Sequence, residues 1–171
     1  DIVKSFLSRK YMGIPGNAAI KQPYFRQRKV YTEINDPDVD GCGMVWICPV
    51  VPFTGEHVSK ALEIITSCVE KYSFEPAISL QCMSERAINI IASIVWDREV
   101  PGEDEQAEAC YAEVNKLLNQ AGYFAYRNTT KGMRSKTLAG TAHDPFSSFV
   151  NSIKQAVDPG NILAPERYNI G

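Results

Sequence analysis

The order of apolar patterns between residues 44 and 97 constrains the fold of this chain most strongly. MVWICPVV (44–51) is a continuous apolar run between Gly43 and Pro52, which is typical of a buried strand. Thr54 can cap a helix, and apolar residues then recur at helical spacing to about Lys71. FEPAISLQC (74–82) and ERAINIIASIVWD (85–97) are two further predicted strands. The last of these places one set of alternate residues on a common face: Ile88, Ile90, Ala92, Ile94 and Trp96.

A second helix and a final strand follow. The acidic stretch at 99–109 opens the helix, since Glu103, Asp104 and Glu105 suit the positive end of a helix dipole, and Gly122 can end it. YFAYR (123–127) is a predicted short strand. The order is then β-α-β-β-α-β, the split βαβ arrangement of ferredoxin-like folds. We predict an α+β fold with an antiparallel sheet and both helices on one face.

The flanking segments differ from this centre. Residues 1–40 are predicted to form an arm that packs on the core or on a missing domain, with a short helix at 1–11. Residues 41–144 form the central domain and end in a polar loop (128–144). Residues 145–171 form an amphipathic helix (145–157) and a tail rich in turn residues. The chain begins with Asp1 and not Met, so we expect a processed or truncated piece.

Composition excludes several classes of protein. The 171 residues suit one domain, and 18 Lys+Arg against 20 Asp+Glu do not fit a broadly basic nucleic-acid binder. No apolar run approaches the roughly 18 residues of a membrane span. The five cysteines lack CxxC pairs and the two histidines are isolated, so we expect neither disulfides nor a metal site. Free thiols favour the cytoplasm, with the periplasm as the alternative.

Residue types alone offer one suggestive pair. Tyr126 and Arg127 combine a hydroxyl with a permanent cation, which together can stabilise an anion such as a phenolate or a carboxylate. Strand alternation would send the two side chains to opposite faces, so their convergence requires the strand to end there. The alternative is a packed Tyr126 and a surface Arg127. We expect His57 to be solvated and His143 to enter a helix, with neither acting as a general base.

The tail SIKQAVDPGNILAPERYNIG (152–171) resembles the C-terminal signature of flavoproteins of the vanillyl-alcohol oxidase and 4-cresol dehydrogenase (p-cresol methylhydroxylase) type. Four more stretches are similar to segments of that family: IPGNAAIK (14–21), GCGMVWICPVVPFTGE (41–56), ERAINIIASIVWDRE (85–99) and AGYFAYRNTT (121–130). Apart from the segment at 14–21, the resemblance covers essentially residues 40–171 in order and spacing.

The resemblance implies a substrate-capping domain and a C-terminal return to an FAD-binding domain that this chain lacks. Tyr126 and Arg127 match the pair that binds the phenol oxygen of para-substituted phenols and favours the phenolate, as hydride leaves for the flavin and a quinone methide forms. Asn89 stands where the family has a substrate-side His, and Trp46 is expected to line the substrate.

Departures from the family pattern concern the flavin. Met44 occupies the position of a His that bonds covalently to FAD in the oxidases, and a thioether cannot form that bond. Tyr31 is the nearest tyrosine to the one that the dehydrogenases use. Glu166 replaces a Gly of the tail, and Arg167 is expected near the flavin pyrimidine. These changes favour non-covalently bound FAD.

The resemblance therefore implies an FAD-dependent oxidoreductase of para-alkylphenols or phenolic alcohols, inactive as this piece alone. Its electron acceptor would be oxygen or a cytochrome c partner, and it could form a homo-oligomer. Two alternatives stay open: the cap of an FAD-linked 2-hydroxy-acid dehydrogenase, with Arg127 holding a carboxylate, and a non-catalytic ferredoxin-like binding domain.

Overall fold

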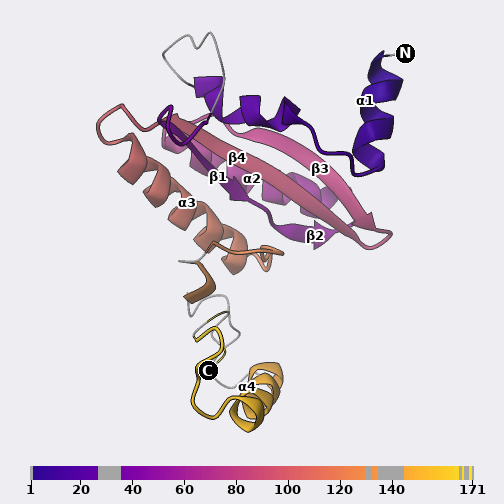
Figure 1. Ribbon diagram of the computed structural model, residues 1–171, viewed down its shortest axis with the longest axis vertical. Coiled ribbons are helices and arrows are strands. Elements are labelled where there is room, and N and C mark those ends of the chain that lie inside the picture. Colours follow the sequence, from indigo (N-terminus) through magenta and orange to yellow (C-terminus); the bar gives the residue numbers. More distant parts are fainter. Residues whose placement is uncertain are drawn as a thin grey trace.

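A computed structural model describes residues 2–26, 36–129, 132–134, 145–165, 167 and 170 (Figure 1). Its helices are α1 (Ile2–Tyr11), α2 (Gly55–Lys71), α3 (Glu103–Gln120) and α4 (Pro145–Val157), with two 3-10 helices, η1 (Asn17–Arg26) and η2 (Gly132–Arg134). Its strands are β1 (Cys42–Ile47), β2 (Val50–Pro52), β3 (Ala77–Ser84) and β4 (Ala87–Asp97). No helix in these described ranges is long and apolar enough to cross a membrane.

The sheet is antiparallel, with β4 at its centre. β3 pairs with one edge of β4, and β1 and β2 pair in succession with the other. The register does not change between β1 and β2, since Ile47 pairs with Ala92 and Val50 with Asn89. The predicted single strand at 44–51 is divided because Pro49 accepts a hydrogen bond from the Ile90 amide (3.0 Å) but has no N–H to return.

The predicted strand at 123–127 is reduced to one bridge, between Ala125 and Pro49. That bridge still lies beside β1 and β2, on the edge away from β4. The order across the sheet is therefore the Ala125 segment, β1 with β2, β4 and β3. This is the ferredoxin-like order, and it confirms the predicted fold class.

The core lies between the sheet and the two helices α2 and α3. The alternate residues of β4 predicted to share a face do pack there, and Ile90, Ala92 and Ile94 are each fully buried. Ile65 of α2 and Val114 of α3 meet them in the same cluster. Burying an aliphatic side chain of this size stabilises the fold by about 1.5–3 kcal/mol, so this layer holds the sheet and both helices together.

The opposite face of the sheet is partly covered by η1, which packs on β4 and β1. The Gln22 side-chain amide donates to the hydroxyl of Ser93 (3.1 Å), and Ser93 is 1% exposed. Tyr24 of η1 also donates to Asp40, in the turn before β1. At least this part of the predicted N-terminal arm therefore packs on the sheet.

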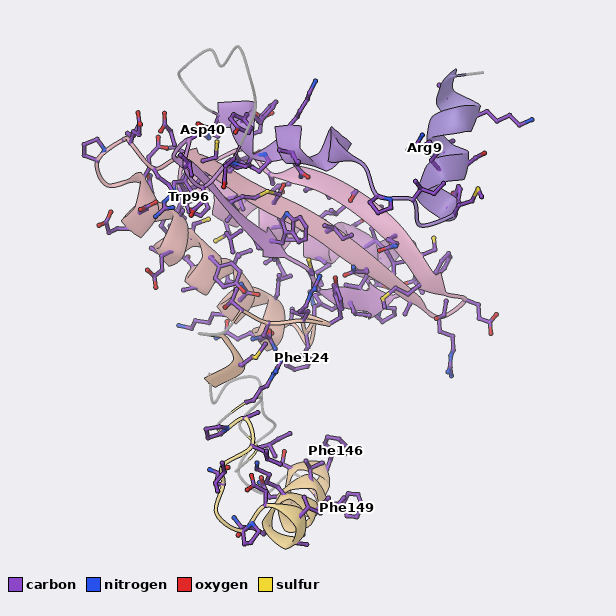
Figure 2. All side chains as sticks on the ribbon, viewed as in Figure 1. Arg9, Asp40, Trp96, Phe124, Phe146 and Phe149 are labelled. Carbon is purple, nitrogen blue, oxygen red and sulfur yellow. The ribbon has the colours of Figure 1, made fainter. Side chains whose placement is uncertain are left out.

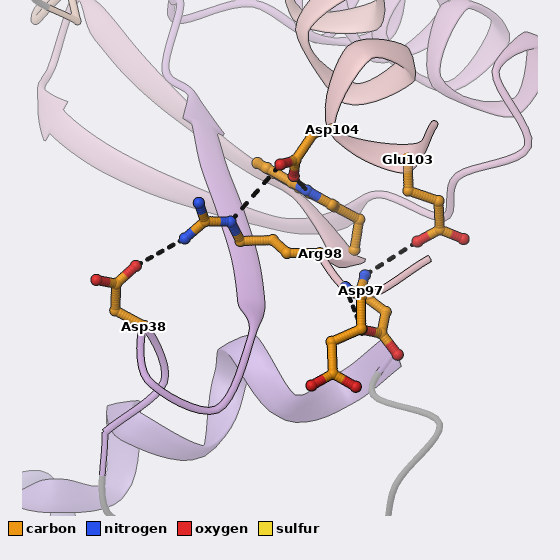
Figure 3. A network of polar contacts seen from close by, with 7 residues as sticks. Asp38, Asp97, Arg98, Glu103 and Asp104 are labelled. Atoms are coloured by element: carbon orange, nitrogen blue, oxygen red, sulfur yellow. Dashed lines mark hydrogen bonds and ion pairs between the residues drawn. The ribbon is translucent and has the colours of Figure 1, made fainter. Parts of the chain in front are cut away.

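Acidic side chains at the start of α3 tie this helix to the end of β4. Glu103 is buried, and its carboxylate accepts a hydrogen bond from the Asp97 amide (3.0 Å). Asp104 accepts a hydrogen bond from the Trp96 indole. It also pairs with Arg98 (3.7 Å), as Figure 3 shows. These acids therefore fix the β4–α3 connection.

The predicted C-terminal helix forms as α4, but its apolar side chains remain in solvent. None of the helix residues is buried, and Phe146 and Phe149 are 71% and 64% exposed. Figure 2 shows both rings pointing away from the helix, and Figure 1 places α4 apart from the sheet. The apolar side of this amphipathic helix is therefore not covered by the described residues.

The predicted turn after α4 is organised around Asp158. Its carboxylate accepts hydrogen bonds from the amides of Ile162 (3.0 Å) and Leu163 (2.9 Å) and pairs with Lys154. The Lys154 ammonium and these amides lower the pKa of Asp158 to about 2. Asp158 is therefore charged, and it holds the turn closed, throughout the neutral range.

Candidate functional site

The end of α3 sets the direction of the segment that carries Tyr126 and Arg127. Gly122 has φ of +83° there, a left-handed conformation that glycine adopts without strain. The Gly122 amide donates to the Asn119 carbonyl (3.0 Å) and the Tyr123 amide to the Leu118 carbonyl (2.9 Å). These two bonds are a Schellman motif, completed by packing of Tyr123 in the cluster that contains Leu118. The sequence therefore stops the helix at Gly122, as predicted, and turns the chain toward the sheet.

Three residues then attach this segment to the break between β1 and β2. The Val50 amide donates to the Phe124 carbonyl (2.9 Å), Ala125 bridges to Pro49, and the Tyr126 amide donates to the Cys48 carbonyl (3.3 Å). The chain bends at Tyr126 and Arg127. Strand alternation therefore no longer applies to this pair.

Tyr126 and Arg127 converge, as they can only when the strand has ended. An Arg127 guanidinium nitrogen donates to the Tyr126 hydroxyl (3.2 Å), and the guanidinium carbon lies 5.5 Å from the centre of the Tyr126 ring. Tyr126 is 47% exposed. The hydroxyl proton and the other guanidinium N–H groups are donors that can meet an anion from solvent.

Cys48 is a titratable residue at the strand break that senses the charge of Arg127. Burial raises the pKa of the Cys48 thiol, and the nearby charge of Arg127 opposes that shift without overcoming it. The thiol is therefore neutral at neutral pH. It therefore does not neutralise the Arg127 guanidinium.

Asn89 lies across the sheet from this pair. It stands opposite Val50, which is bonded in turn to Phe124, so two strand spacings, about 10 Å, separate the Asn89 and Phe124 backbones. Asn89 is 2% exposed, and among the described residues its side-chain carbonyl oxygen has no hydrogen-bond partner. A buried acceptor left without a donor destabilises a protein by about 1–3 kcal/mol. This oxygen is therefore a candidate acceptor for a ligand donor.

Trp46 shares the sheet face of Asn89, because it stands opposite Ser93, which is four residues from Asn89 on β4. Trp46 is 49% exposed and offers apolar surface there. Met44 is half-buried and lines a different feature, a cavity of about 730 Å³ between β1 and α3. Neither Trp46, Asn89, Tyr126 nor Arg127 lines that cavity. This cavity and the anion-binding pair are therefore separate.

The two residues assigned to the flavin do not come together. Met44 lies in the sheet, whereas Arg167 is an exposed residue of the tail, which Figure 1 places beside α4. The Arg167 amide donates only locally, to the Ala164 carbonyl (3.2 Å). The described residues thus do not form an FAD site by themselves. Tyr31, His143 and Glu166 lie outside the described residues.

One polar contact next to the candidate site was not foreseen. His57, expected to be solvated, is half-buried, and its Nδ1 atom lies 2.9 Å from the Tyr123 hydroxyl. The two rings meet edge to face, with centres 5.8 Å apart. The two residues are 66 positions apart in the chain, so no local sequence pattern predicts this hydrogen bond.

Comparison with known proteins finds two curated relatives. The chain is 38% identical over 169 residues to 1'-carboxy-chondrochloren decarboxylase of Chondromyces crocatus, which covers 99% of this chain and 31% of that protein. It is 29% identical over 131 residues to the flavoprotein subunit of 4-cresol dehydrogenase (hydroxylating) of Pseudomonas putida, which covers 76% of this chain and 24% of that protein. The chain thus spans about a third or less of these relatives. No protein-family model matches it.

Solved structures give the same picture. The chain superposes on p-cresol methylhydroxylase with substrate bound at a TM-score of 0.67 and 28% identity, over 75% of this chain and 24% of that one. It superposes on 4-ethylphenol oxidase from Gulosibacter chungangensis, in complex with isoeugenol, at a TM-score of 0.64 and 20% identity, over 76% of this chain and 25% of that one. The second likeness supports the fold alone.

Proposed function

We propose that this chain, a relative of the FAD-linked oxidases of the p-cresol methylhydroxylase type in sequence and in fold, forms the substrate-capping and C-terminal part of an FAD-dependent oxidoreductase. The intact protein would oxidise para-alkylphenols or phenolic alcohols. The observation that carries the proposal is the hydrogen-bonded pair of Tyr126 and Arg127 at the end of the sheet.

The pair acts by holding the substrate phenol as its phenolate. The guanidinium and the tyrosine hydroxyl both donate to the phenol oxygen, and such charge-assisted bonds favour the ionised form. A phenolate can release hydride from the carbon attached para to the oxygen, because its negative charge moves into the ring and leaves a neutral quinone methide. FAD, bound non-covalently by the rest of the protein, is the proposed acceptor of that hydride.

Asn89 and Trp46, which share one face of the sheet, complete the proposed substrate site. The Asn89 side-chain oxygen has no donor within the described ranges, so it suits a hydroxyl or an N–H on the substrate's para side chain. The exposed indole of Trp46 suits the apolar part of the substrate. Asn89 is neutral, so it selects by hydrogen bonding and supplies neither charge nor an acid.

The test uses the intact protein that contains this chain, with a dye as electron acceptor and 4-cresol, vanillyl alcohol and lactate as substrates. We expect turnover of the phenols and not of lactate. Arg127→Ala should lower kcat/KM by about 10²-fold or more, because it removes the cation at the reacting anion. Arg26→Ala is the matched control, since Arg26 also lies over an aromatic ring, that of Phe74, away from the site. Turnover of lactate but of no phenol would support the hydroxy-acid alternative, and turnover of neither would support a binding domain.

A second candidate function is oxidation coupled to decarboxylation. The relative matched at higher identity, over nearly the whole chain, is named as a decarboxylase. A phenol such as 3-(4-hydroxyphenyl)propanoate could lose hydride from its benzylic carbon to FAD. The bond to the carboxylate would then break, its electron pair would form the alkene, and the quinone methide would return to a phenolate. The products are 4-vinylphenol and carbon dioxide, with the flavin reoxidised by the electron acceptor.

Product analysis separates the two candidates. If decarboxylation occurs, carbon dioxide and 4-vinylphenol appear in a one-to-one ratio with dye reduction. Dye reduction on this acid without release of carbon dioxide would leave only simple phenol oxidation.

A further inference from the structure

The bond between His57 and Tyr123 joins the start of α2 to the segment that carries Tyr126 and Arg127. His57 lies in the first turn of α2, where its backbone amide donates to the side chain of the capping Thr54 (3.5 Å). α2 packs against the sheet through the main core cluster. The imidazole is therefore mounted on a rigid part of the fold.

Tyr123, the partner of His57, is held by two helices and lies close to Tyr126 in the chain. Its amide is held by the end of α3, its ring is buried at 4% exposure, and its hydroxyl is held by His57 of α2. Two helices thus fix one residue, and Tyr126 follows only three residues later. Within the described chain, the Tyr126 amide is the last backbone group of this segment that bonds to the sheet, at 3.3 Å. The way in which Tyr123 is held therefore contributes, with these backbone bonds, to the direction of the chain at Tyr126.

We propose that His57 is a positioning residue: through the Tyr123 hydroxyl it fixes the segment 123–127 so that Tyr126 and Arg127 face the substrate oxygen. His57 touches neither member of that pair by any bond seen here, so it acts only through Tyr123. The expected effect of His57 on phenol binding rests on the proposed function. The expected effect of His57 on the order of the segment 123–127 does not rest on it.

The first experiment measures that order directly. Hydrogen–deuterium exchange of the peptide spanning 123–127 is followed by mass spectrometry in the intact protein and in Tyr123→Phe and His57→Phe, which both keep a ring. We expect the exchange to be about fivefold faster in each variant, because one hydrogen bond that holds the segment is lost. Tyr72→Phe is the matched control. It removes a partly buried hydrogen bond from another tyrosine hydroxyl, that of Tyr72 to Glu113 (2.6 Å), and this bond does not involve the segment 123–127. Exchange that is unchanged in both test variants, or equally faster in the control, would overturn the proposal.

The second experiment asks whether the segment's position matters for the substrate. In the intact protein, Tyr123→Phe and His57→Phe should each raise KM for 4-cresol about tenfold, and the double variant should be no worse than either single one. His57→Gln should recover part of the loss, because an amide can still bond to the hydroxyl. If neither the unmodified protein nor any variant oxidises phenols, the proposed function is wrong. The hydrogen–deuterium exchange of the segment 123–127 then still tests the positioning role of His57. If phenols are taken but KM is unchanged in both variants, the positioning role in binding fails and the proposed function stands.

Discussion

At the scale of single residues, the electrostatics of the candidate site depend on which neighbours of Arg127 are charged. Cys48 sits close enough to sense the guanidinium, yet burial keeps its thiol protonated at neutral pH. The Tyr126 hydroxyl accepts a hydrogen bond from the same guanidinium. In the part of the chain that the structure describes, the groups placed at this cation are a tyrosine hydroxyl and a neutral thiol, an arrangement that attracts an anion from solvent.

Gly43 is required by the packing of Trp96. A Cβ atom at position 43 would lie 2.1 Å from Cε2 of the Trp96 ring, and that ring is also held by Asp104. Gly43→Ala should therefore lower the free energy of unfolding by about 1–3 kcal/mol. Gly55→Ala is the control, because nothing lies within 4 Å of its added Cβ, and it should be neutral or stabilising by about 0.4–1 kcal/mol. Urea denaturation midpoints for the two variants check this, and equal midpoints would contradict it.

The sequence indicates some of the site residues and not others, for physical reasons. Tyr126 and Arg127 are adjacent in sequence, so their contact could be predicted once the strand was assumed to end at these residues. His57 and Tyr123 are distant in sequence and meet only because α2 and α3 pack on the same face. The orphaned oxygen of Asn89 depends on every group packed around it. No pattern along the chain records that property.

At the scale of elements, α2 and α3 end in the same way with different residues. Both close with Schellman bonds, but the left-handed position is Gly122 after α3 and Ser73, with φ of 58°, after α2. Ser73→Gly should raise the free energy of unfolding by about 0.5–1 kcal/mol, because the left-handed strain of a non-glycine residue is removed. Gly122→Ala should lower it by about 1–2 kcal/mol. Thermal unfolding of both variants checks the pair, and shifts of the same sign would contradict the account.

The turn after α4 should open in acid. The pKa of Asp158 is lowered from 3.8 to about 2 in the folded turn, so the stability that its carboxylate supplies is present above pH 4 and is lost as the pH falls from about 4 to 2. Amide chemical shifts of Ile162 and Leu163, followed by NMR, should report a transition in that window. Asp158→Asn should remove the transition. A transition that persists in this variant would mean that another group controls the turn.

Element boundaries were predicted less well than element order, and proline explains one case. The apolar run at 44–51 indicates one strand, and its register is indeed continuous, but Pro49 leaves a ladder bond unmade. The segment at 123–127 has strand-like residues, yet the Schellman turn and the bend at Tyr126 leave room for a single bridge. Both departures come from backbone hydrogen bonding, which apolar periodicity does not report.

At the scale of the whole molecule, the order of patterns was sufficient to predict the ferredoxin-like sheet with α2 and α3 on one face. The position of η1 across the other face and the exposed apolar side of α4 could not be predicted, because amphipathic spacing shows that a face is apolar but not what covers it. The chain also spans only 31% and 24% of its curated relatives. Under the proposed function, this chain supplies the phenolate-binding half of the active site and the remainder of the protein supplies FAD.

The central claim is that Tyr126 and Arg127 bind a phenol as its phenolate. The most direct measurement is the absorbance of 4-nitrophenol bound to the intact protein across a pH series, since its phenolate has a separate visible band. The account predicts that this band appears on binding at pH values where the free phenol is neutral, that Tyr126→Phe reduces the shift, and that Arg127→Ala abolishes it. Bound 4-nitrophenol that ionises at the same pH as in free solution, or that keeps its shift in Arg127→Ala, would contradict the account.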